Sequence, residues 1–138
     1  MKIVIDSNII MSALIKDSIT RKIIVESNNS FFHPKIALRN LEKYKSELIE
    51  KSNINEYELN EVLKDLLGKI SLIEDEEFLV KLDEAKEIMG TIDIEDIPFI
   101  AAALTINADG IWSFNKHFLQ QDKIKVITTE ELINIDNE

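Results

Sequence analysis

The sequence contains no cysteine and little glycine or proline. Its 138 residues include three glycines and two prolines. Without cysteine the chain forms neither disulfides nor thiolate metal sites, and thiol catalysis is excluded, which fits a reducing cytoplasm. The three glycines are scattered at expected helix ends and turns. No glycine-rich loop is therefore present to cradle a phosphate, which excludes the P-loop and the dinucleotide-binding fingerprint.

Positive charge and long apolar runs are also scarce. Lysine and arginine number 16 against 26 acids, for a formal net charge of −10. This excess of negative charge disfavours sequence-independent binding of nucleic acid, although it allows a local basic strip and suits a basic partner. Asp6 interrupts the apolar segment that an N-terminal secretion signal needs, and no stretch approaches membrane-spanning length. We therefore expect a cytoplasmic protein that has no membrane partner.

Histidine is rare as well, with only His33 and His117 in the chain. They fall on separate expected elements, and neither has a serine–acid partner at a recognisable spacing. A serine triad is therefore not expected. We predict that both histidines are structural or surface residues.

Short β-branched or aromatic runs alternate with amphipathic segments along the chain. The expected strands are residues 3–5, 31–33, 70–73, 111–113 and, at an edge of the sheet, 124–127. Helices are expected after Ser7, over residues 17–25, 35–51, 56–67 and 76–89, from Asp96, over residues 114–121, and from Thr128. This alternation, with no repeat or linker, predicts one domain over residues 1–138. Its expected fold is a three-layer α/β/α sandwich around a parallel sheet of four to five strands.

The first strand is the element around which the sheet is expected to form. Residues 3–5 are apolar without alternation, as in the buried centre of a parallel sheet. Asp6 follows at the carboxyl end of this strand, where ligands bind in open α/β sheets. Ser7 is expected to cap the helix that follows. A capping role explains Asp6 equally well, so this one acid does not decide the function.

Other polar side chains are expected at the same edge of the sheet. Asp93 and Asp96 precede an apolar helix whose first turn contains Pro98, and Ser113 and Asn115 follow the fourth strand. Carboxylates around a shallow cleft suit Mg²⁺ or Mn²⁺ and metal-assisted phosphodiester hydrolysis. From spacing alone, a capping role for Asp93 or Asp96 is at least as good an interpretation.

Three linked motifs resemble those of the PIN-domain family. They are residues 4–8 with Ser12-Ala13, residues 96–103 and residues 110–118, and residues 128–132 resemble the family's closing strand and helix. The resemblance spans the chain in order. It implies a metal-dependent endoribonuclease, very often the VapC-like toxin of a toxin–antitoxin pair, that binds Mg²⁺ or Mn²⁺. It also implies that Asp6 and Asp96, with Asp93 beside them, are the metal-binding and catalytic acids.

Two positions depart from the family pattern. The family usually has glutamate where this chain has Asn40, and aspartate where it has Asn115. Each amide keeps an oxygen that can support the ion or its waters, but it removes one negative charge and weakens the binding of a hard cation. Glu42 does not replace the missing glutamate, because two residues along a helix turn it to the other face. Glu47 lies about 10 Å further along the helix.

Contacts to RNA are expected beside this site. Lys35, Arg39 and Lys43 recur at helical spacing, and Lys116 is adjacent to Asn115. A solvated face with Glu–Lys pairs is the favoured interpretation of the first three. The expected substrate-binding residues are Asn8, Arg39, Lys43, Ser113 and Lys116.

Three functions are consistent with these residues. The first is a PIN-type endoribonuclease, and the resemblance implies that it is a homodimer with a basic antitoxin partner, which the charge of −10 suits. The second is a PIN-like fold that has lost catalysis and binds a partner or RNA, which Asn40 and Asn115 favour. The third is an α/β phosphotransfer receiver with Asp6 as acceptor. It leaves residues 96–103 and 110–118 unexplained.

Overall fold

The computed structural model describes residues 1–15, 18–52, 55–90 and 92–136. In these residues five parallel strands form one sheet in the order β3-β2-β1-β4-β5. The strands are β1 (Lys2–Ile5), β2 (Ser30–Pro34), β3 (Ile70–Ile73), β4 (Gly110–Trp112) and β5 (Val126–Ile127). The central position of β1 and the edge position of β5 are as predicted.

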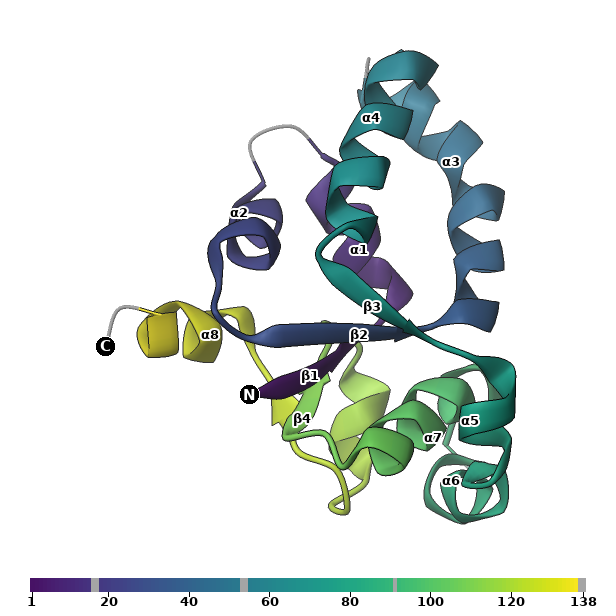
Figure 1. Ribbon diagram of the computed structural model, residues 1–138. Helices are drawn as coiled ribbons and strands as arrows, with labels where there is room; N and C mark the ends of the chain where they lie inside the picture. Colours follow the sequence, from purple (N-terminus) through teal and green to yellow (C-terminus); the bar gives the residue numbers. More distant parts are fainter. Residues whose placement is uncertain (16–17, 53–54, 91, 137–138) are drawn as a thin grey trace.

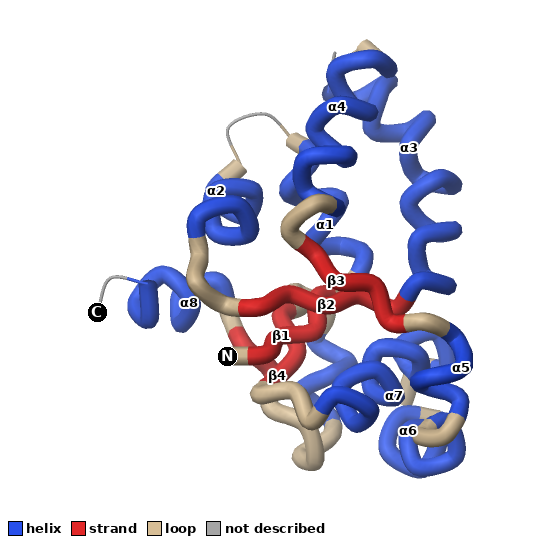
Figure 2. The backbone as a smooth tube through the Cα atoms, in the orientation of Figure 1, coloured by secondary structure: helices blue, strands red, loops and turns tan. Residues whose placement is uncertain are grey.

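Helices cover both faces of the sheet, so the predicted three-layer sandwich is confirmed (Figures 1 and 2). One face carries α1 (Ser7–Leu14), α2 (Ile19–Glu26), α3 (Leu38–Ser52), α4 (Glu56–Leu67) and α8 (Thr129–Asp136). The other carries α5 (Asp75–Leu79), α6 (Leu82–Met89) and α7 (Ile97–Ile106). None of the described helices is long and apolar enough to cross a membrane.

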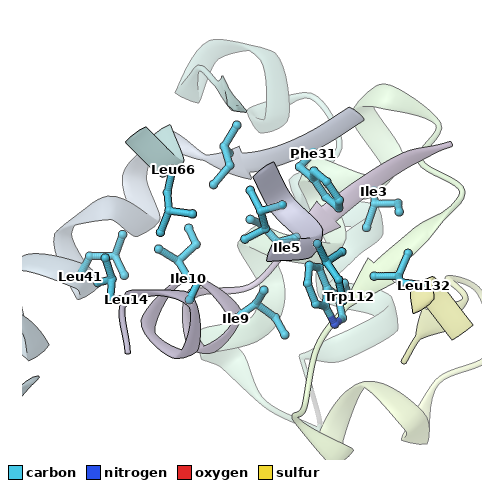
Figure 3. Packing of buried hydrophobic residues seen from close by; sticks show 14 of the residues in the cluster. Ile3, Ile5, Ile9, Ile10, Leu14, Phe31, Leu41, Leu66, Trp112 and Leu132 are labelled. Atoms are coloured by element: carbon cyan, nitrogen blue, oxygen red, sulfur yellow. The ribbon is translucent and has the colours of Figure 1, made fainter. Parts of the chain in front are cut away.

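The two hydrophobic cores explain how β1 is held in place. Ile3 and Ile5 are fully buried with Trp112 on the side of α1, and Figure 3 shows their side chains close to the indole ring. Val4 and Ile111 face the opposite core, against α7. Burial of each of these aliphatic side chains contributes about 1.5–3 kcal/mol. Because both faces of β1 are buried at the centre of the sheet, the next residue, Asp6, leaves the sheet at its carboxyl edge.

The helix predicted over residues 76–89 is in fact two helices, and the prediction of one continuous helix was wrong. Phe78 in α5 is buried, whereas Leu79 and Val80 are 56% and 82% exposed, so the buried stripe does not continue across them. The backbone amide of Lys81 donates to the carbonyl of Phe78, which closes a tight turn before α6 begins.

Two other helices differ from the predictions. The helix expected from Lys35 starts with a 3₁₀ turn, η1 (Lys35–Ala37), because the preceding residue is Pro34 in an extended conformation. Residues 114–121 form a short 3₁₀ helix, η3 (Lys116–Gln120), rather than an α-helix. The helix expected over residues 17–25 is α2, which Ser18 caps, and Asp17 lies outside the described residues.

The turn between η3 and β5 depends on the side chain of Gln121. Its Nε2 donates to the carbonyls of Phe118 and Ile124, both at 2.7 Å, and its Oε1 accepts from the amides of Lys123 and Ile124 at 3.0 and 2.8 Å. We expect Gln121→Ala to lower the free energy of unfolding by about 1–2 kcal/mol, because these backbone groups lose their partner. Urea unfolding followed by circular dichroism measures this change.

The matched control for this prediction is Gln120→Ala, which removes the same side chain from an exposed position one residue earlier. Its unfolding midpoint should stay within experimental error of the parent. Equal midpoints for both variants would show that the four hydrogen bonds of Gln121 add nothing to stability.

Candidate active site

A pocket of about 160 Å³ opens at the carboxyl edge of the sheet. It combines residues that follow β1 and β4 with residues from α3, from the segment before α7 and from α7 itself. They are Asp6, Ser7, Asn8, Asn40, Tyr44, Asp93, Glu95, Asp96, Phe99 and Asn115. The fold therefore brings together the three acids and the two amides that were singled out from the sequence.

Asp6 is the most deeply buried acid of this pocket, since it is only 4% exposed. Its Oδ1 accepts from the amide of Ile9 at 3.0 Å, and its Oδ2 accepts from the hydroxyl of Ser113. Burial raises the pKa of the Asp6 carboxyl, although these hydrogen bonds oppose the shift. The residue is both a helix cap and a wall of the pocket.

The prediction that Ser7 caps α1 was wrong, because Asp6 does so. Asp6 has the extended backbone of a cap residue, with φ −85° and ψ 172°, and Ser7 is the first residue of the helix. The Ser7 hydroxyl is buried and has no hydrogen-bond partner among the described residues. A polar atom left unpaired at a pocket wall is available to a bound water or ligand.

Asp93 and Asp96 come from the 3₁₀ turn η2 (Ile94–Asp96) and the residue before it. Oδ1 of Asp93 accepts from the amide of Glu95 at 3.0 Å, and its Oδ2 lies 2.8 Å from Nδ1 of His117. Asp96 is buried, and its Oδ2 accepts from Nδ2 of Asn115 at 3.0 Å. Each carboxylate thus has a nitrogen donor from the segment that follows β4.

The pKa values of Asp93 and Asp96 are shifted in opposite directions. Burial, followed by the negative charges of Asp93 and Asp6, raises the pKa of Asp96 to about 7. The hydrogen bond from His117 lowers the pKa of Asp93. At neutral pH, Asp93 is therefore ionised, and Asp96 is divided between its two protonation states. A cation in the pocket would favour the ionised form of Asp96.

Asn115 is oriented by three hydrogen bonds. Its backbone amide donates to Oγ of Ser113 at 2.9 Å, and its Oδ1 accepts from the amide of His117 at 3.0 Å. These contacts turn Nδ2, the donor end of the amide, toward Asp96. An aspartate at this position could not donate in this way. Asn40, the other amide, is exposed on α3 at the rim of the pocket.

The basic residues expected to contact RNA are less concentrated around the pocket than their spacing in the sequence suggested. Arg39 lines a separate groove of about 230 Å³ between α3 and α4. Nζ of Lys35 lies 3.3 Å from a carboxylate oxygen of Glu74. Lys43 and Lys116 are exposed, and neither is among the residues that line the pocket. Of the expected substrate-binding residues, Asn8 lines the pocket and Ser113 hydrogen-bonds to Asp6.

Sequence reasoning missed His117, which was assigned a structural or surface role. Its side chain is 48% exposed, and its Nδ1 lies 4.0 Å from Oδ2 of Asp96 as well as 2.8 Å from Asp93. The ligand atoms of these three residues all lie within 4.8 Å of one another. The available signal was its position two residues after Asn115, since an Asn side chain at the start of a turn commonly binds the amide two residues on.

His33 occupies a different environment. It is fully buried, its Nδ1 lies 2.8 Å from the carbonyl of Ile5, and its ring packs on Phe99 at 5.7 Å. Burial lowers the pKa of His33 to about 4, so its ring is neutral at physiological pH. His33 supports β1 and Phe99 from behind the pocket.

The family model for the PIN domain matches residues 4–134, from β1 through most of α8. The chain belongs to the PIN-domain family. It has no significant match among curated proteins. The match includes the segments 96–103 and 110–118, which the phosphotransfer-receiver alternative left unexplained, and so it replaces that alternative.

The PIN domain is a nuclease-type fold, and PIN domains generally depend on a divalent metal ion. The donor set of this pocket fits such an ion. Asp93, Asp96 and His117 converge within 4.8 Å, Asp6 is close enough to raise the pKa of Asp96, and the buried Ser7 hydroxyl is free to bind a coordinated water. Carboxylate oxygens are the ligands that hard divalent ions prefer.

Proposed function

We propose that this PIN domain is a metal-dependent endoribonuclease that cuts single-stranded RNA. Asp6, Asp93 and Asp96 hold Mg²⁺ or Mn²⁺, and Asn40 and Asn115 support the ion or its waters. The observation that carries the proposal is the Asp96 carboxyl, which is buried against two other acids with a pKa of about 7. Buried like charges are costly without a cation, and carboxyls with strongly shifted pKa values gather at functional sites.

The residues of the pocket have distinct tasks in this proposal. A bound divalent ion lowers the pKa of its water and neutralises charge that develops on the phosphate. Ser113 and the Ile9 amide hold the Asp6 carboxylate in one orientation. Asn8, which lines the pocket, and Lys116, which follows the pocket residue Asn115, contact the RNA backbone, since backbone contacts position a nucleic acid. Lys43, which is exposed on α3 next to the pocket residue Tyr44, extends this contact.

The direct test uses purified protein and a fluorescent single-stranded RNA. Cleavage should stop in excess chelator and return when Mg²⁺ or Mn²⁺ is restored. Single-stranded DNA and duplex RNA of the same sequence are the substrate controls. Asp96→Asn, purified in the same way, controls for contaminating ribonuclease. Cleavage that persists in chelator, or that is equal in this variant, would contradict the proposal.

We further propose that the nuclease is the toxin of a toxin–antitoxin pair, acting on cytoplasmic RNA as a homodimer. The net charge of −10 and the groove beside Arg39, lined largely by leucines, support a basic partner with an apolar segment. Induced expression should arrest growth, and expression of Asp96→Asn should not. Light scattering of the purified protein measures the oligomeric state. Growth that is unaffected by the parent protein would argue against the toxin role.

A second candidate is a PIN domain without catalysis that binds RNA or a protein partner. The hydrogen bond from Nδ2 of Asn115 to Asp96 favours it, because the amide occupies a carboxylate oxygen that a cation would otherwise use. The cleavage experiment separates the two candidates. RNA binding without cleavage, over the full range of both ions, would support this second function.

A further inference from the structure

We propose that Nδ1 of His117 is a ligand of the bound metal ion, so that the site prefers Mn²⁺ and similar transition-metal ions to Mg²⁺. This inference rests on the proposed function and makes it more specific. It adds a nitrogen donor to a site that was expected to hold its ion through oxygen atoms alone. It also assigns a role to His117, which was expected to be a structural or surface residue.

The distances around His117 match those between neighbouring ligands of one ion. Its Nδ1 lies 2.8 Å from Oδ2 of Asp93 and 4.0 Å from Oδ2 of Asp96. With bonds of about 2.1 Å, adjacent ligands of an octahedral ion are about 3.0 Å apart and opposite ligands about 4.2 Å apart. One ion can therefore reach all three atoms with small side-chain movements.

The backbone near His117 is tied to the rest of the pocket. Oδ1 of Asn115 accepts from the His117 amide, the Asn115 amide donates to Ser113, and Ser113 donates to Asp6. This series of hydrogen bonds fixes the start of η3 relative to β1. The imidazole itself is half-exposed and can adjust its ring. In the hydrogen bond to the Asp93 carboxylate, Nδ1 carries a proton. To hold an ion, the ring would release that proton to water and be protonated at Nε2, which would leave the Nδ1 lone pair as the ligand.

The donor set explains the expected preference among ions. Asn40 and Asn115 lack the negative charge of the carboxylates that the family usually has at these positions, which weakens the attraction for a hard ion such as Mg²⁺. Affinity for a site with a nitrogen donor rises from Mn²⁺ through Co²⁺ and Ni²⁺ to Cu²⁺ and is lower again for Zn²⁺, whereas Mg²⁺ takes oxygen ligands. His117 thus offsets the lost carboxylates only for ions that accept nitrogen.

The experiment measures ion binding separately from catalysis. Calorimetric titration of the full chain with Mn²⁺ and with Mg²⁺ should show at least about tenfold tighter binding of Mn²⁺. His117→Ala should weaken Mn²⁺ binding by about tenfold or more and Mg²⁺ binding by less than about threefold. Leu119→Ala, at an exposed position of the same 3₁₀ helix, should change neither affinity. His117→Gln provides a second variant if the alanine variant is poorly folded.

A spectroscopic measurement identifies the ligand directly. Pulsed electron paramagnetic resonance of bound Mn²⁺, with ¹⁵N-labelled histidine, should show nitrogen coupling in the parent and in Leu119→Ala. His117→Ala should lose it, although His33 keeps its label. Absent coupling in the parent, or equal weakening of both ions by His117→Ala, would overturn the inference. RNA cleavage is measured in a separate experiment. Nitrogen coupling without cleavage would reject the proposed function alone, and cleavage without nitrogen coupling would reject this inference alone.

Discussion

Asp96→Asn is expected to lower RNA cleavage by about 1000-fold, the largest effect of any single substitution in the pocket. The asparagine keeps the shape of the side chain and can still accept from Nδ2 of Asn115. It removes the buried negative charge that makes the pocket attractive to a divalent ion. The loss should therefore appear in ion affinity as well as in the cleavage rate, and calorimetry with Mn²⁺ measures the affinity directly.

The same substitution should stabilise the protein when no divalent ion is present. The pKa of Asp96 is raised from 3.8 to about 7, so the folded state holds this proton more tightly than the unfolded state does. The stabilisation that the protonated Asp96 carboxyl contributes to the folded state is fully present below about pH 4 and is lost as the pH rises through about 7. Because the side chain borders an open pocket, screening reduces the effect to about 2 kcal/mol.

The difference in stability between Asp96→Asn and the parent should therefore depend on pH. At pH 8 in chelator, Asp96→Asn should unfold about 5–10 °C above the parent, and at pH 5 the gap should narrow markedly. Asp122→Asn is the control, since it removes an exposed acid that does not line the pocket. A variant that is less stable than the parent at pH 8 would show that the Asp96 charge is well compensated without an ion.

The sheet could be predicted because its signals are local and redundant. Each strand is a short β-branched or aromatic run between turn residues, and β1 lacks alternation because it is covered on both faces. The break between α5 and α6 could not be predicted in this way. Leu79 and Val80 are apolar and fit a helical stripe in the sequence, yet both are exposed, and only the packing of Phe78 against α7 shows where the stripe ends.

The site was predictable where it depends on strand ends. Asp6 and Asn115 follow β1 and β4, and neighbouring parallel strands end at the same edge, so their convergence follows from the topology. The role of His117 depends on a 3₁₀ turn, since only that turn brings its imidazole back to Asp93. Arg39 shows the reverse case: its spacing suggested the RNA side of α3, but it lines the groove toward α4.

Asn115→Asp is expected to raise affinity for Mn²⁺ by about 10- to 100-fold. The substitution restores a carboxylate beside Asp96 and replaces the donor Nδ2 with an oxygen that can ligate an ion. Without an ion, the new carboxylate would lie about 3 Å from Oδ2 of Asp96, where Asn115 now donates at 3.0 Å. Two carboxyls at that distance cannot both ionise, so the pKa of one should rise further.

The stability that Asn115→Asp loses without an ion tests whether the Asn115 amide compensates the charge of Asp96 as a cation would. Loss of its hydrogen bond to a charged partner should lower stability by about 1–3 kcal/mol at pH 8, and saturating Mn²⁺ should restore it. Asn115→Ala is the matched control, because it loses the contact to Asp96 and the contact to the His117 amide without adding charge. Thermal unfolding of both variants, with and without Mn²⁺, separates the effects. If Asn115→Asp binds Mn²⁺ no better than the parent, the amide is not what limits ion binding, and the second, non-catalytic function loses its main support.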